Sequence, residues 1–144
     1  MSVHLQKIVV LHAFPVVFTR HLFSPRNRAL RDALTRGGGR SRCLVLLDRG
    51  VLAAHPRLPE QIRTYFTTHE GDLQLVRAPL ALAGGEIIKQ SDGPVRRMVE
   101  ALRAGNICRH SYCIAIGGGA FLDAAGLAAA LFHRGVRLVR IPTT

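Results

Sequence analysis

Three consecutive glycines, Gly117, Gly118 and Gly119, follow a short apolar run at residues 112–116 and precede a segment with helical character. Glycine has no Cβ, so its backbone N–H groups can approach an anion closely, and the N-terminus of the following helix attracts negative charge. A strand, a tight glycine turn and a helix therefore indicate a site for a phosphate or diphosphate group. A turn that only reverses the chain would look the same locally, because this triplet is not the G-x-G-x-x-G fingerprint.

Polar residues with possible binding roles also follow other apolar runs. Asp48 comes directly after residues 43–47, where its carboxylate could accept hydrogen bonds from ribose hydroxyls, although Asp-Arg-Gly is also ordinary turn and capping chemistry. Glu86 and Lys89 stand three residues apart behind two glycines. That spacing fits a loop that lines a ligand, and it fits equally a local ion pair in solvent.

Thr143 and Thr144 follow Pro142 at the end of the apolar run at 136–141. In an open parallel sheet, ligands collect at the carboxyl ends of the strands. We therefore expect these threonines and the glycine triplet to lie at the same edge of a sheet.

The elements that must position these residues are predicted from apolar periodicity. Helices are expected at residues 24–36, with Ser24 as cap and Pro25 in the first turn, and at 58–69, 94–104 and 121–132. Strands are expected at residues 43–47, 73–82, 112–116 and 136–141, and a bent edge strand or two short strands at 8–17. Such alternation predicts one α/β domain over residues 1–144, Rossmann-like, with a parallel sheet and helices on both faces.

Small residues at Ala125, Gly126 and Ala129 give the helix expected after the glycines a low face that can lie close to the sheet. The seven histidines show no metal-binding spacing such as H-E-x-x-H, so no metal is assigned to this chain.

Composition limits the class of protein. The chain has 144 residues, 48% of them hydrophobic, which is ordinary for one globular domain. Its net charge of +11 comes from scattered arginines without a basic block, so we expect no nucleic-acid partner. The longest apolar run, residues 124–132, is too short to span a membrane, and three cysteines without a C-x-x-C pair favour the cytoplasm.

With its motifs in this order, the chain resembles the 3-dehydroquinate synthase superfamily, the sugar-phosphate cyclases. The resemblance rests on the strand ending in Asp48, the loop at 84–89, the glycine turn up to Asp123, the segment 128–135, and the final Ile-Pro-Thr-Thr at 141–144. It implies that this half binds NAD. Asp48 would hold the adenosine ribose, Glu86 and Lys89 would line the cofactor site, and Gly118 and Gly119 would pack on the diphosphate.

The same resemblance implies further roles. Asp123 would face the nicotinamide side, Thr143 and Thr144 would complete the pocket, and Arg134 would reach a substrate phosphate, in some members across a dimer interface. Each residue has a simpler interpretation: Asp123 as a charge favoured in the first turn of a helix, Arg134 as a helix C-cap, and the threonines as strand residues.

For the complete protein, the resemblance implies a homodimer that eliminates phosphate from a small phosphorylated sugar. A C-terminal helical domain, missing from this chain, would hold zinc or cobalt with one glutamate and two histidines, so no catalytic residue is expected here and the chain alone is expected to be inactive. Leu122 departs from the usual small residue and points to a divergent branch. The alternatives are a relative of glycerol dehydrogenase or iron-type alcohol dehydrogenase, which usually carries lysine at the position of Gly126, and a non-catalytic nucleotide-binding remnant.

Overall fold

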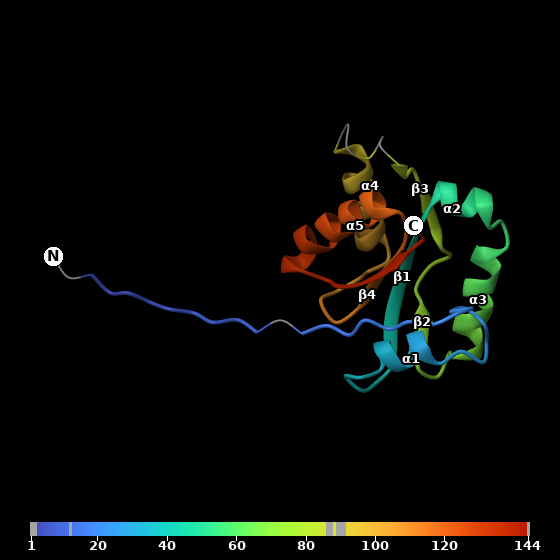
Figure 1. Ribbon diagram of the computed structural model, residues 1–144, viewed down its shortest axis with the longest axis horizontal. Coiled ribbons are helices and arrows are strands. Elements are labelled where there is room, and N and C mark those ends of the chain that lie inside the picture. Colours follow the sequence, from blue (N-terminus) through green and yellow to red (C-terminus); the bar gives the residue numbers. More distant parts are fainter. Residues whose placement is uncertain (1–2, 12, 86–87, 89–91, 144) are drawn as a thin grey trace.

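A parallel sheet forms the centre of the computed structural model, which describes residues 3–11, 13–85, 88 and 92–143 (Figure 1). Its strands are β1 (Ser41–Asp48), β2 (Leu73–Leu75), β3 (Leu80–Leu82), β4 (Tyr112–Gly117) and β5 (Arg137–Pro142). The strand order is β2-β1-β4-β5, and β3 also pairs with β1, beside its carboxyl end. All pairs are parallel, as the alternating sequence pattern predicts.

Helices cover both faces of this sheet, which confirms the predicted α/β class. The helices are α1 (Ala29–Leu34), α2 (Arg49–Ala54), α3 (Leu58–Thr68), α4 (Gly93–Ala104), α5 (Gly119–Leu131) and the short 3-10 helix η2 (Phe132–Arg134). One apolar cluster joins α4 and α5 to one face, and a second joins α1 and α3 to the other (Figure 1). Residues 43–48 of β1 are all buried. The continuous apolar run at 43–47 suits a strand that is covered on both faces.

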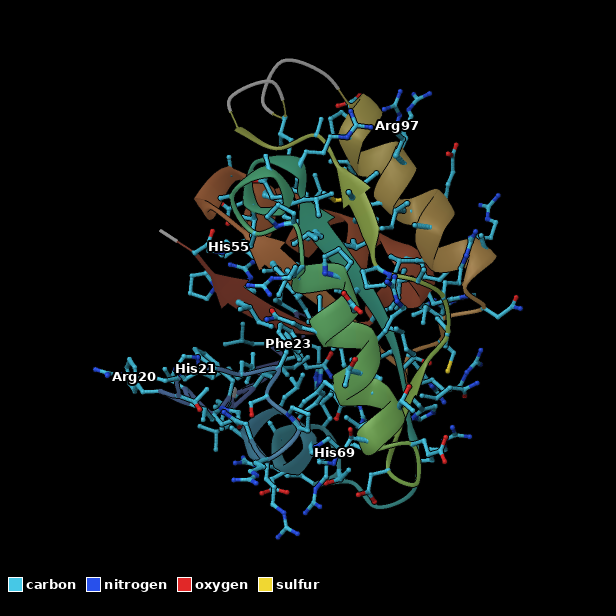
Figure 2. The ribbon with its side chains drawn as sticks, turned by 90° about the vertical axis from the view of Figure 1, so that its right-hand side faces the viewer. Arg20, His21, Phe23, His55, His69 and Arg97 are labelled. Carbon is cyan, nitrogen blue, oxygen red and sulfur yellow. The ribbon has the colours of Figure 1, made fainter. Side chains whose placement is uncertain are left out.

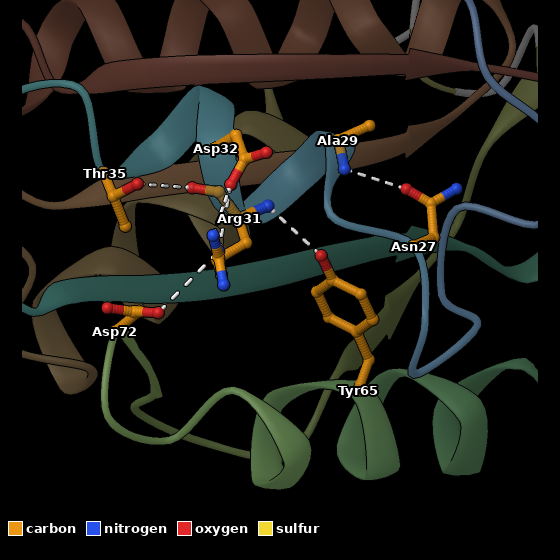
Figure 3. Close-up of polar contacts among 7 residues, drawn as sticks. All are labelled: Asn27, Ala29, Arg31, Asp32, Thr35, Tyr65 and Asp72. Carbon is orange, nitrogen blue, oxygen red and sulfur yellow. Dashed lines mark hydrogen bonds and ion pairs between the residues drawn. The ribbon is translucent and has the colours of Figure 1, made fainter.

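Tyr65 of α3 connects α1 to the second cluster. Its ring is fully buried and its hydroxyl accepts a hydrogen bond from the backbone N–H of Arg31 at 3.1 Å (Figure 3). Arg31 in turn lies 3.7 Å from the Asp72 carboxylate, beside the start of β2. A first-turn amide of α1 thus finds a partner on α3 that also fills the core.

The predicted start of the first helix is wrong. Helix α1 begins at Ala29, and the side chain of Asn27 accepts the Ala29 N–H at 2.8 Å (Figure 3). Ser24 instead belongs to a turn in which its carbonyl accepts the Asn27 N–H. The N-cap position is Arg28, which makes no side-chain cap hydrogen bond, so the first amide of α1 is met by the residue before the cap.

The strand predicted at residues 73–82 is two strands, β2 and β3, that both pair with β1. The Val76 N–H still bonds the Cys43 carbonyl, and the ladder then stops before Pro79. Proline has no N–H to donate and is disfavoured inside a sheet, which explains the interruption.

The strands predicted at residues 8–17 are absent from the described part of this segment, 8–11 and 13–17. Here the chain runs extended away from the sheet (Figure 1), and Val9 and Leu11 are 96% and 92% exposed. β-Branched residues favour strands only where a neighbouring strand can pair with them, so composition alone was misleading here.

Other predicted elements are confirmed with small shifts at their ends. Helix α3 buries Ile62, Tyr65 and Phe66, and α4 ends at Gly105 as expected. In α5, Ala125 and Ala129 are buried against the sheet, as the small-residue pattern predicts. No helix in the described residues has the length and apolar character needed to cross a membrane.

Candidate functional site at the carboxyl edge of the sheet

The chain reverses its direction of travel across the sheet between β1 and β4. From β1 it proceeds to β2 and β3 on one side, and it then crosses back to β4 and β5 on the other. Open α/β sheets bind their ligands at such a switch point, beyond the carboxyl ends of the two central strands, and this place is called the crevice below. Asp48 ends β1 and Gly117 ends β4, so both candidate motifs meet at this crevice.

Asp48 is only 8% exposed, and its Oδ1 accepts the Gly50 N–H at 2.8 Å. It is the N-cap of α2, so the capping interpretation of this residue is confirmed. A carboxylate has further acceptor positions beyond this one bond. The cap therefore leaves acceptor capacity at the crevice.

Two glycines allow this close packing around Asp48. A Cβ on Gly84 would overlap the Asp48 carboxylate, and a Cβ on Gly117 would lie 3.0 Å from the Asp48 Cβ and 2.8 Å from Phe121 Cδ1. Gly84 is the first of the two glycines in the loop that was expected to line a ligand. In the structure Gly84 instead approaches the Asp48 carboxylate of the chain itself.

The turn at Gly118 and Gly119 presents an open helix N-terminus. Gly118 is the N-cap of α5 and forms no side-chain cap hydrogen bond, and a Cβ on Gly119 would meet no atom within 4 Å. The first N–H groups of a helix need partners from outside it, and together with the helix dipole they attract anions. The geometry thus fits the predicted diphosphate position.

Thr143 lies at the same edge, because its N–H bonds the Gly117 carbonyl at 3.1 Å and its side chain is exposed. Asp123 is one turn into α5 and not in its first turn, so the interpretation of its charge as a first-turn feature is wrong. Its exposed carboxylate lies 3.6 Å from Nη1 of Arg140 on β5. Leu122 is buried against the core.

Arg134 is not brought together with these residues. It follows α5, whose 13 residues run from the carboxyl edge of the sheet to its amino edge, about 20 Å at 1.5 Å per residue. His133, Arg134 and Gly135 have φ of 51°, 61° and 113°, a left-handed run that non-glycine residues adopt rarely. Arg134 is exposed there, at the opposite end from Gly118.

The remaining predicted site residues, Glu86, Lys89 and Thr144, lie outside the described residues. Within the described residues no group of three or more His, Cys, Asp and Glu side chains could hold a metal ion. Among the described candidate residues, the open glycine turn is the part that could receive an anion.

Sequence reasoning missed Arg140 and its contact with α5. A Cβ on Gly126 would lie 2.6 Å from Nη2 of Arg140, so the guanidinium occupies the space that a side chain on this helix would fill. The one sequence signal was a glycine inside an otherwise strong helix pattern, which was assigned to close packing on the sheet.

A doubly wound sheet with a glycine turn and a buried acid at its switch point is the architecture typical of nucleotide-binding α/β domains. Comparison with known proteins narrows this class. Residues 79–144 match the family model described as 3-dehydroquinate synthase N-terminal. Over 133 residues the chain is 34% identical to 2-epi-5-epi-valiolone synthase of Streptomyces hygroscopicus subsp. jinggangensis, covering 92% of this chain and 30% of the relative.

A second relative is 3-dehydroquinate synthase of Paracoccus denitrificans, which is 43% identical over 119 residues, with 81% of this chain and 29% of the relative covered. These matches agree with the predicted resemblance: the chain is similar to the N-terminal part of 3-dehydroquinate synthase and of 2-epi-5-epi-valiolone synthase. It spans about 30% of the length of these relatives.

Solved structures agree with this relationship. The valiolone synthase of Streptomyces hygroscopicus subsp. jinggangensis, solved with NAD⁺ and Zn²⁺ bound, matches 96% of this chain and 35% of its own at a TM-score of 0.70 and 29% identity. A 2-deoxy-scyllo-inosose synthase complexed with carbaglucose-6-phosphate, NAD⁺ and Co²⁺ matches 85% of this chain and 30% of its own at a TM-score of 0.62. At 23% identity the latter shares the fold.

Proposed function

We propose that this chain is the NAD-binding part of a 3-dehydroquinate synthase-like sugar-phosphate cyclase, a lyase that eliminates phosphate from a small phosphorylated sugar. The observation that carries the proposal is the open N-terminus of α5 at Gly118 and Gly119 beside the buried carboxylate of Asp48. The relationship to cyclases that were solved with NAD⁺ supports it.

In this proposal the backbone N–H groups of Gly118 and Gly119 receive the diphosphate, aided by the dipole of α5. Asp48 accepts hydrogen bonds from the adenosine ribose while it continues to cap α2, Asp123 faces the nicotinamide side, and Thr143 closes the pocket. Glu86, Lys89 and Thr144 are assigned to the same pocket from the family resemblance alone. The bound dinucleotide would supply transient oxidation of a substrate hydroxyl, which acidifies the neighbouring C–H before phosphate leaves.

Arg134 is proposed to bind the substrate phosphate in the site of a second subunit. Its place at the amino edge, a helix length from Gly118, makes action within its own crevice unfavourable. Leu127 and Leu131 on the outer surface of α5 are 52% and 65% exposed, and α5 is apolar enough to expect a covered outer face. A homodimer that covers this surface would bring Arg134 toward the partner.

The catalytic metal, zinc or cobalt, and the substrate-binding bases are assigned to parts of the protein other than these residues. We therefore expect the chain to bind NAD without completing a reaction. The dehydrogenase alternative is disfavoured by Arg140, because its guanidinium fills the space beside Gly126 where such relatives usually carry lysine. The second candidate is a non-catalytic nucleotide-binding remnant. An absence of saturable NAD binding would favour this remnant over the cyclase.

The test is a calorimetric NAD titration of the chain and of its Gly119→Asp variant. A Cβ at this position meets no atom within 4 Å, and an aspartate is favourable at a helix start, so folding should be unchanged, while its charge would repel the diphosphate. We expect saturable 1:1 binding, weakened at least about tenfold by the substitution. Gly71→Asp, in an open turn away from the crevice, is the matched control. Absent binding, or equal binding by both variants, would contradict the proposal.

A further inference from the structure

Arg140 connects strand β5 to helix α5 at the edge of the crevice. It pairs in the sheet with Ala115, two residues before the strand ends at Pro142, and shares a face of β5 with Leu138, which packs against the α5 cluster. Its Nη1 lies 3.6 Å from Oδ1 of Asp123. The pair therefore lies on the surface that joins the glycine turn to the end of β5.

Gly126 leaves the room for this guanidinium. A Cβ there would lie 2.6 Å from Nη2 and 3.6 Å from Cζ of Arg140, while the nearest other atom, Leu138 Cδ2, is at an ordinary contact distance of 3.8 Å. The close contact of an added Cβ at position 126 is therefore with the Arg140 side chain alone. Alanine is preferred to glycine inside a helix, and α5 uses alanine at six other positions.

Folding stability does not explain this arrangement. The side chains of Arg140 and Asp123 are 52% and 78% exposed, and an exposed ion pair of this kind contributes little to stability. A helix glycine weakens α5, so the pair and the glycine together cost stability or leave it unchanged. Their place beside the crevice indicates a role there.

We propose that Arg140 is a positioning residue that restrains the Asp123 carboxylate one turn beyond the glycine turn, and that Gly126 is present to admit it. This inference rests on the proposed function, since Asp123 is there assigned to the nicotinamide side. The guanidinium limits the rotamers of an exposed aspartate and offsets its negative charge near an anionic cofactor. Without Arg140 the exposed carboxylate is free to change rotamer, and its negative charge is not offset.

The test is a double-mutant cycle on NAD affinity in the chain, with Arg140→Gln, Asp123→Asn and the two combined. We expect Arg140→Gln to weaken NAD binding about fivefold when Asp123 is present, and less than about twofold in the Asp123→Asn background. An equal loss in both backgrounds would mean that Arg140 contacts the ligand directly, and this would overturn the positioning role. Arg137→Gln, on the same strand but in contact with Tyr112, is the matched control and should leave affinity unchanged.

Gly126→Ala is a second test, in which NAD affinity and stability should change in opposite directions. The new methyl displaces the flexible end of Arg140, so NAD binding should weaken as in Arg140→Gln, while better helix propensity raises the midpoint temperature of unfolding by about 2–4 °C. Unchanged NAD affinity in this variant would overturn the inference. If the unsubstituted chain does not bind NAD at all, the proposed function is wrong as well. If it binds NAD and the double-mutant cycle shows no coupling between Arg140 and Asp123, only the role of Arg140 is wrong.

Discussion

At the scale of single residues, Asp48 is the most constrained side chain of the crevice. One of its oxygens caps α2, and its carboxylate packs where neither Gly84 nor Gly117 has room for a side chain. A capping acid and a ligand-binding acid were separate readings of the sequence. The geometry allows one carboxylate to do both, because the cap uses one acceptor position.

Substitutions at Asp48 should separate these two roles. Asp48→Ala removes the cap and should lower the free energy of unfolding by about 1 kcal/mol, together with a loss of NAD affinity. Asp48→Asn caps as well as aspartate, so stability should remain while affinity still falls, because an amide accepts ribose hydroxyls with only one oxygen. Urea unfolding and NAD titration of both variants measure this. If Asp48→Asn and the parent bind NAD equally well, Asp48 does not bind the ribose and only caps α2.

The three cysteines should differ sharply in reactivity. Burial raises the pKa of both Cys43 and Cys113 to about 12, whereas the hydrogen bond with the Ser111 hydroxyl lowers the pKa of the exposed Cys108 thiol. At pH 8 a thiol reagent should modify one cysteine of the folded chain and all three after unfolding. Ser111→Ala should shift Cys108 modification to higher pH. Three equal rates in the folded chain would contradict the burial of β1 and β4.

The same burial links stability to alkaline pH. The folded-state pKa of Cys43 and Cys113 is raised from 9.0 to about 12, so the folded chain retains their protons where the unfolded chain loses them. This contribution is complete below pH 9 and is lost as pH rises toward 12.

At the scale of elements, the sequence predicts best where one strong local pattern has one solution. The apolar run of β1 and the periodic faces of α3 and α4 are of this kind. Predictions failed where strand formation depends on a neighbouring strand, as in the extended N-terminal segment. They also failed where a proline interrupts an apolar run, as before β3.

The candidate site follows the same division. Asp48 and the glycine turn could be placed from sequence because both directly follow strands of one parallel sheet. The Arg140 contact with Asp123 and Gly126 could not, because it depends on how α5 crosses β5. The position of Arg134 at the other edge likewise required the length and direction of α5.

The extended N-terminal segment should be separable from the fold. Its large apolar side chains are exposed, among them Val9 at 96% and Phe18 at 94%, and such surface promotes self-association. Removal of residues 1–18 should leave the helical circular dichroism and the unfolding midpoint within about 2 °C, and should reduce association in light scattering. A clear loss of stability would mean that the segment packs on the sheet.

At the scale of the whole molecule, the candidate residues are divided between the two edges of the sheet. The two labelled arginines, Arg20 and Arg97, lie on different sides of the molecule and form no common basic face (Figure 2). The crevice lies at the carboxyl edge, and Arg134 lies at the amino edge. This separation is the reason for proposing that Arg134 serves a neighbouring subunit.

The measurement that tests the central claim most directly is an amide NMR spectrum of the ¹⁵N-labelled chain during NAD titration. Our account predicts saturable shifts at the carboxyl edge, in residues 48–50, 84, 117–121 and 143, with the amino edge and the outer face of α3 unchanged. No shifts, or shifts confined to α3 or the amino edge, would contradict a dinucleotide site at the switch point.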